Sequence, residues 1–156
     1  MTSARFSALG LDIGNRRIGV AGCDGTGLIA TGLGVIHRQN YVKDVAALNG
    51  WIEQRQAKIL VIGLPLLSDG SRGSQAEKVA AFVRVIQQKI NLPVEYINEY
   101  LSTVQASWDL QSVGIASKQQ KHLIDQHAAA VILQEWLDQR RHRTGVAARG
   151  VSDSPS

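Results

Sequence analysis

Three acidic residues stand out because each interrupts or borders a segment that otherwise suits a protein interior. Asp12 lies within an apolar run, Glu99 follows an alternating apolar segment, and Asp125 heads an apolar helical stripe. Gathered together, three carboxylates repel one another unless a cation joins them, and Mg²⁺ and Mn²⁺ prefer such oxygen ligands. Two such ions about 4 Å apart can activate a water and stabilise a leaving alkoxide in phosphodiester cleavage.

Each of these acids also has a purely structural explanation. Asp12 could pair with an arginine in the turn that follows it. Glu99 could stabilise the start of the next helix, because a helix N-terminus carries a partial positive charge. Asp125 could pair with Lys118 or Lys121 on its own helix. Taken one at a time these explanations are simpler, so the case for chemistry depends on whether the fold gathers the three carboxylates.

The elements around Asp12 are predicted to form an antiparallel meander. Residues 6–13 and 18–23 are apolar runs separated by a short turn that contains a Gly-Asn pair. A second turn opens with Asp-Gly, a strong hairpin signal, and residues 28–37 form a third strand. Strands joined by such short turns must run antiparallel.

The next part of the chain predicts alternating helices and strands. Apolar residues recur at helical spacing over residues 41–52, and residues 58–62 are a continuous apolar run, as in a strand covered on both faces. A capping box at residues 74–77 predicts the start of a second helix, and residues 94–97 alternate as a strand. Strand, helix, strand implies a parallel crossover, which brings Glu99 toward the sheet edge that carries the first acid.

The last predicted helix turns Asp125 toward the sheet. This residue shares a stripe with four apolar residues at helical spacing, namely Ala128, Ala129, Ile132 and Trp136. The two alanines are small, so the helix can approach the sheet closely. We expect it to end near residue 139, after a short helix over residues 102–110.

The whole pattern predicts one α/β domain over residues 1–143. Its core is a mixed five-stranded sheet, with a three-strand antiparallel meander, two parallel strands and flanking helices. The tail at residues 144–156 is rich in Gly, Ala, Ser and Arg, and we expect it to be disordered.

The composition fits a globular protein in a reducing compartment. Of 156 residues, 44% are hydrophobic and 19% charged, which is enough for one domain with its own core. The single cysteine excludes an internal disulfide, and no apolar run is long enough to span a bilayer. We therefore expect a cytoplasmic protein with no membrane partner. The net charge of +4 lies mostly in the tail, so it is compatible with a nucleic-acid partner but is weak evidence for one.

Four short motifs lie in and beside the predicted elements. They are LGLDIG with RIGVA from residue 9, VIGLP from residue 61 with Gly70 and Gly73, NEYLST from residue 98, and IDQHAAAVIL from residue 124. Together they resemble the YqgF family, described as Holliday-junction resolvases and as pre-16S rRNA nucleases of the ribonuclease-H-like superfamily. The resemblance covers about residues 8–137.

The resemblance assigns the family's acidic triad to Asp12, Glu99 and Asp125, as catalytic residues and as ligands of Mg²⁺ or Mn²⁺, with two ions expected. Candidate contacts to nucleic-acid phosphates are the basic residues Arg16, Arg17, Arg72, Lys118 and Lys121. The chain has Asn98 and Tyr100 where the family usually has Asp and Arg. The second change removes a cation that can bind phosphate, which affects the grip on substrate.

The resemblance implies a metal-dependent endonuclease that hydrolyses phosphodiester bonds in structured RNA, in 5′-end maturation of pre-16S rRNA during ribosome biogenesis. Branched DNA is the alternative substrate of the same site. The chain would be a monomer or a homodimer, and symmetric cutting of a four-way junction requires the dimer.

Two further functions stay open. A non-catalytic RNA-binding assembly factor is favoured by the two departures but opposed by the retention of all three acids, because a binder of polyanions gains nothing from clustered carboxylates. A nucleotide-binding ATPase fragment of the actin and sugar-kinase kind also begins with Asp-x-Gly before a hairpin. Such proteins need two domains to enclose ATP, and this chain has room for one.

Overall fold

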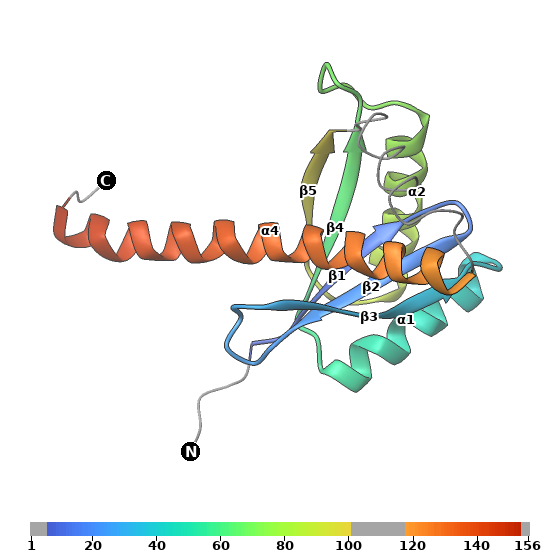
Figure 1. The fold of residues 1–156 in the computed structure, drawn as a ribbon, viewed down its shortest axis with the longest axis horizontal. Helices are drawn as coiled ribbons and strands as arrows, with labels where there is room; N and C mark the ends of the chain where they lie inside the picture. Colours follow the sequence, from blue (N-terminus) through green and yellow to red (C-terminus); the bar gives the residue numbers. More distant parts are fainter. Residues whose placement is uncertain (1–5, 101–117, 154–156) are drawn as a thin grey trace.

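A mixed five-stranded sheet forms the centre of the fold, as the sequence predicts (Figure 1). The structure, a computed structural model, describes residues 6–100 and 118–153. The strands are β1 (Ala8–Ile13), β2 (Arg17–Cys23), β3 (Ala30–His37), β4 (Ile59–Leu66) and β5 (Val94–Tyr100). Their order across the sheet is β3-β2-β1-β4-β5. The first three form the antiparallel meander, whereas β1, β4 and β5 are parallel and end at the same edge.

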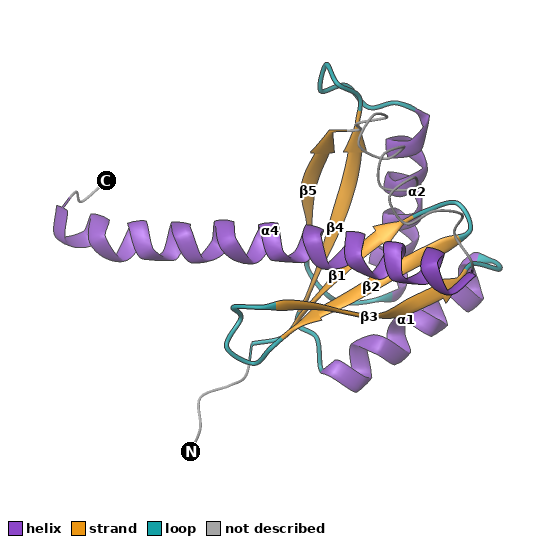
Figure 2. Cartoon of the chain, viewed as in Figure 1, coloured by secondary structure: helices purple, strands orange, loops and turns teal. Residues whose placement is uncertain are grey.

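Helices cover both faces of this sheet (Figure 2). The helices α1 (Tyr41–Arg55) and α2 (Ser74–Lys89) pack on one face, and α4 (Lys118–Asp153) crosses the other. Side chains alternate along a strand, so β1 serves both layers. Leu9 and Leu11 join the core beneath α1 and α2, whereas Ala8 joins the core beneath α4. The same alternation directs Asp12 toward α4.

Glycines in the strands let α4 lie directly on the sheet backbone. A Cβ atom on Gly19 would be 2.1 Å from the carbonyl oxygen of Asp125, and one on Gly10 would be 2.6 Å from Cβ of Leu133. Real Cβ atoms do not approach so closely. The helix therefore reaches this position only because the strand residues beneath it lack side chains, in addition to the small Ala129, which is fully buried.

The helices α1 and α2, on the opposite face, begin with different N-cap residues. The side chain of Asn40 caps α1 by accepting the Lys43 N–H at 2.9 Å, as a residue with a short polar side chain does well at this position. The capping box predicted at residues 74–77 is wrong. α2 is capped by Gly73, which makes no side-chain hydrogen bond, and the Gly73 carbonyl accepts the Glu77 N–H at 3.1 Å. Ser74 is already inside the helix and cannot act as its cap.

The last helix is longer than the sequence predicts. The apolar pattern predicts an end near residue 139, whereas α4 continues to Asp153. No proline lies between Pro93 and Pro155, so no residue of α4 lacks the backbone N–H that a helix needs. The short helix predicted over residues 102–110 lies outside the described residues. Within the described ranges, no helix is both long and apolar enough to cross a membrane.

Candidate active site

Asp12 lies one residue before the end of β1, opposite Gly19 of β2. The turn that follows is tight, because the Gly14 N–H donates to the Arg17 carbonyl at 2.9 Å. Arg38, directly after β3, stabilises this turn by donating a hydrogen bond from Nη1 to the Gly14 carbonyl at 2.8 Å. The backbone beside the first acid is therefore held by hydrogen bonds from the neighbouring strands.

Asp125 comes from α4, whose backbone rests on Gly19 at this residue. Its carboxylate accepts a hydrogen bond from Nε of Arg17, the first residue of β2, and both side chains are partly buried. The sequence offers an arginine of the turn as a partner of Asp12. The structure pairs the arginine with Asp125 instead, which ties the start of α4 to the meander.

Glu99 lies near the end of β5, opposite Pro65 of β4. Its Cγ is 3.6 Å from the position that a Cβ on Gly63 would take, so the missing side chain of Gly63 leaves space beside it. Burial raises the pKa of Glu99 to about 7, and the charge and hydrogen bond of the Glu135 carboxyl group add to this effect. The carboxylate of Asp12 raises it further. Glu99 therefore faces the same space as Asp12 and also contacts α4 through Glu135.

Asp12 is the electrostatic centre of this group. Burial raises the pKa of Asp12 to about 6, and the nearby carboxylate of Asp125 contributes to the shift. Because Asp12 in turn raises the pKa of Glu99, it interacts with both other members of the predicted triad. Three segments distant in sequence thus bring their acids to one edge of the sheet.

The donor set fits a hard divalent cation. Within residues 6–100 and 118–153, no three Asp, Glu, His or Cys side chains are placed to bind one ion together. The carboxylates instead interact as two pairs, Asp12 with Asp125 and Asp12 with Glu99. Mg²⁺ keeps several waters and needs only one or two carboxylates, so such pairs are compatible with a hydrated divalent cation.

The five candidate phosphate contacts have different surroundings. Arg16 is exposed in the turn after β1, whereas Arg17 is engaged with the acid on α4. Arg72 is exposed in the loop after β4 and lies near Tyr96. Tyr96 belongs to the face of β5 opposite to that of the predicted triad, because side chains alternate. Lys118 and Lys121 lie in the first turn of α4, and their side chains are outside the described part of the structure.

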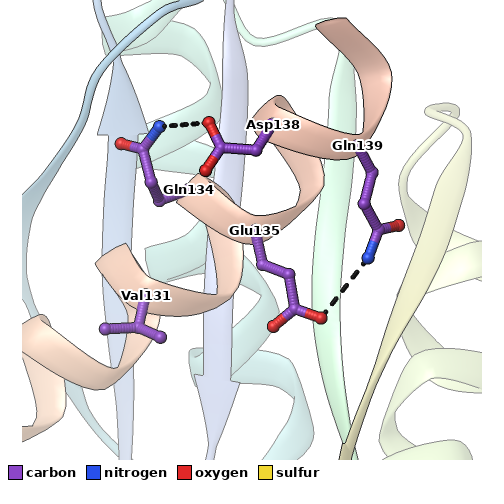
Figure 3. Close-up of a pocket in the computed structure, with 5 residues that line it drawn as sticks. All are labelled: Val131, Gln134, Glu135, Asp138 and Gln139. Carbon is purple, nitrogen blue, oxygen red and sulfur yellow. Dashed lines mark hydrogen bonds between the residues drawn. The ribbon is translucent and has the colours of Figure 1, made fainter. Parts of the chain in front are cut away.

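Sequence reasoning missed two residues that shape the site. Arg38 carries no motif signal, and its role appears only when β3 pairs with β2. Glu135 lies off the apolar stripe of α4, so only the register between α4 and β5 reveals that it meets Glu99. Figure 3 shows Glu135 at a shallow hollow on α4, where it accepts a hydrogen bond from Gln139 at 3.4 Å.

Comparison with known proteins agrees with these observations. A family model named RuvX and described as Holliday junction resolvase matches residues 6–139. A protein of Synechococcus sp. (strain JA-3-3Ab) is 64% identical over 137 residues, which are 88% of this chain and 86% of that protein. A protein of Gloeobacter violaceus (strain ATCC 29082 / PCC 7421) is 53% identical over 135 residues, 86% of this chain and 85% of that protein. Both carry the name "Putative pre-16S rRNA nuclease".

The fold also has a solved counterpart. T. thermophilus RuvC in complex with Holliday junction substrate aligns with a TM-score of 0.52 and 13% sequence identity, over 87% of this chain and 96% of that one. This likeness confirms the predicted fold class. The expected class of enzyme, a hydrolase of phosphodiester bonds, is the class of the matching family. Because the family model spans most of the sequence and the relatives share half or more of their residues with it, the chain belongs to the RuvX family, the one that its motifs resemble under the name YqgF.

Proposed function

We propose that this chain is a metal-dependent endonuclease that matures the 5′ end of pre-16S rRNA by hydrolysing a phosphodiester bond. The observation that carries the proposal is the position of Asp12 between two other acids. The nearby carboxylate of Asp125 raises the pKa of Asp12, and the carboxylate of Asp12 raises the pKa of Glu99. The family match and the names of the relatives support the same class of reaction.

Stability alone does not account for this arrangement. Partly burying a carboxylate costs free energy, and a second carboxylate beside it adds to the cost. Arg17 offsets the charge of Asp125, but Asp12 has two acidic neighbours. Binding of divalent cations and a phosphate group would offset the free-energy cost of placing these acids together.

The surroundings of each site residue indicate a role in binding metal, transferring a proton or binding phosphate. Bound Mg²⁺ or Mn²⁺ would supply a water of lowered pKa and charge neutralisation at the phosphate. Asp12 and Asp125 would hold such ions from β1 and α4, and Glu99 from β5. The carboxyl group of Glu99, with a pKa raised to about 7, is also able to accept or release a proton near neutral pH. Arg16 is exposed beside the site and is available to a phosphate of the substrate.

The two departures from the family pattern are compatible with catalysis. Asn98 is exposed and precedes Glu99 in β5, so its side chain points to the opposite face of the strand. The change from Asp to Asn at this position therefore removes a negative charge that would lie on the other face of the strand from the three acids. We expect the loss of the usual Arg at Tyr100 to weaken the grip on substrate rather than the chemical step.

The direct test is a cleavage assay with a precursor RNA that contains the 5′ flank of 16S rRNA and, in parallel, a four-way DNA junction. Each substrate is incubated with Mg²⁺ or Mn²⁺ and with either wild-type protein or Asp12→Asn. We expect the RNA to be cut by wild-type protein only. Equal cutting by the variant would assign the activity to a contaminant and overturn the proposal.

The junction serves as a test of the second candidate function. The description of the family model favours a Holliday-junction resolvase. Paired symmetric nicks would support that function and would require a homodimer with two active sites. If RNA binds but neither substrate is cut with either metal, the chain acts as an assembly factor on a nuclease fold.

A further inference from the structure

The C-terminal part of α4 lies beyond both the sheet and the family match. Leu137 is the last residue of the helix that is known to be buried, and Figure 1 shows the helix continuing well past the sheet. The family model ends at residue 139. We call residues 140–153 the basic arm. It holds four arginines against one aspartate, a net charge of +3 out of the chain's +4.

Aromatic side chains anchor the root of the basic arm. The guanidinium of Arg140 lies 4.1 Å from the ring centroid of Phe6, and Phe6 stacks on Trp136 with 5.9 Å between centroids. Trp136 is buried and donates from Nε1 to Glu95 of β5 at 2.8 Å. The helix therefore leaves the domain from a fixed point, with its direction set by packing against β5 and the N-terminal segment.

The first cation that follows this anchor is available to a partner. Arg141 pairs with Asp138 at 2.8 Å, but both side chains are about half exposed, and such surface pairs contribute little free energy. His142 is exposed, and Arg143 and Arg149 follow in the same helix. Residues 141–153 contain no aromatic residue, leucine or isoleucine, so the segment is poorly suited to insertion into a lipid surface.

We propose that the basic arm is a second nucleic-acid contact, which binds the sugar–phosphate backbone of a duplex flanking the cleavage site. The proposal rests on the proposed function and extends it to a surface outside the family's shared segment. The argument is charge complementarity, because clustered arginines on a protruding helix displace the counterions of a polyphosphate. The acidic site and the basic arm would then engage one substrate at two points.

The length of α4 determines how much substrate is needed. Arg140 and Arg149 lie 15 and 24 residues after Asp125, which corresponds to about 22 and about 36 Å along the helix axis. At about 3.4 Å per base pair this equals about 7 to 11 base pairs of duplex. A shorter duplex cannot reach the arm while it occupies the acidic site.

The experiment compares wild-type protein with the triple variant R141Q/R143Q/R149Q, in which glutamine keeps the helix propensity and Arg140 keeps its contact with Phe6. Dissociation constants are measured by fluorescence anisotropy in Ca²⁺, a divalent cation that also takes carboxylate oxygens, with RNA and DNA hairpins whose stems have about 6 or about 24 base pairs. For the long stems we expect about tenfold or greater loss of affinity, and a salt dependence reduced by up to about 3 in slope. For the short stems we expect no change.

The matched control is K78Q/R84Q/K89Q, which removes the same charge from exposed positions of α2 on the other face of the sheet. Equal losses for both triple variants, or a loss independent of stem length, would overturn the proposal. So would unchanged binding of the long stems. Circular dichroism verifies that α4 stays helical. Because binding rather than cleavage is measured, a failure of the chain to cleave any substrate would refute the proposed function without affecting this test.

Discussion

At the scale of single residues, the buried carboxylate of Asp12 lowers the free energy of unfolding of the protein at neutral pH. The pKa of Asp12 is raised to about 6 in the folded state, above its ordinary value, chiefly because the residue is buried. The folded state therefore holds the proton more tightly than the unfolded state does. It follows that the free energy of unfolding falls as the pH rises from about 4 to about 7, over the window in which only the unfolded chain releases this proton readily.

Asp12→Asn should therefore stabilise the protein while abolishing cleavage. At pH 8 we expect the free energy of unfolding to rise by about 1–3 kcal/mol, whereas at pH 4, where Asp12 is protonated in the folded state, the change should be small. Urea unfolding at both pH values measures it. Glu77→Gln, at an exposed acid on α2, is the control. A gain of equal size at both pH values would mean that charge at Asp12 is not the cause.

Arg17 is expected to act through Asp125 rather than through the substrate. Its Nε donates to Asp125 and the pair is partly buried. Arg17→Gln should lower the free energy of unfolding by about 1 kcal/mol and leave the salt dependence of RNA binding unchanged. The neighbouring Arg16 is exposed, so Arg16→Gln should do the opposite, keeping stability and reducing the salt slope by about 1. Titration of RNA binding against salt distinguishes the two, and a lower slope for Arg17→Gln would make it a phosphate contact.

The three acids of the candidate site can be singled out in the sequence because a carboxylate among apolar residues is conspicuous wherever it occurs. The partners of these acids cannot. Arg17 and Asp125 are separated by more than a hundred residues, and Glu135 meets Glu99 only through the packing of α4 against β5. Side-chain pairing across elements depends on register and crossing angle, which a periodic pattern does not specify.

At the scale of elements, the approach of α4 to the sheet decides whether the acids meet. The sequence points to small residues on the helix, whereas the structure shows that glycines in the strands matter at least as much. A Cβ on Gly19 would collide with the Asp125 backbone at 2.1 Å, and one on Gly63 would lie 2.5 Å from Cδ1 of Ile132. Strand glycines are easily attributed to turns or bulges, so their role in helix packing appears only with the topology.

Gly19→Ala should separate α4 from the meander at Asp125. Because the clash is with backbone, which cannot rotate away, we expect a loss of about 1–3 kcal/mol in the free energy of unfolding and a strong loss of cleavage. Gly50→Ala is the matched control, because Gly50 lies within α1 and a Cβ there meets nothing within 4 Å. That change should stabilise by up to about 1 kcal/mol. Thermal or urea unfolding of both variants tests the pair, and a tolerated Gly19→Ala would contradict the close packing.

The predicted elements and their order agree with the structure where hydrophobic periodicity is strong, as in the meander and in β4. Local rules were less reliable at the ends of helices. The capping box at residues 74–77 has the right residue types, but α2 begins one position too early to use it. The end of α4 could not be predicted from apolar periodicity, because the helix outlasts its contact with the sheet.

At the scale of the whole molecule, the site forms only when three parts of the chain have folded together. Asp12 comes from the meander, Glu99 from the parallel crossover and Asp125 from the helix that covers both. No two consecutive elements suffice to build it. A ligand that joins these carboxylates therefore stabilises the entire fold rather than a local segment.

Divalent cations should accordingly raise the melting temperature of the wild-type protein. A ligand that binds only the folded state stabilises it by RT ln(1 + [L]/Kd), so an ion at about ten times its Kd contributes about 1.4 kcal/mol, or a few degrees in Tm for a chain of this size. Asp12→Asn removes the carboxylate shared by both pairs and should abolish the increase. Sodium chloride at equal ionic strength controls for screening of the like charges. An equal rise in Tm of the variant would mean that the cations bind elsewhere on the molecule. In that case the repulsion among the carboxylates at Asp12 would have no connection with metal binding.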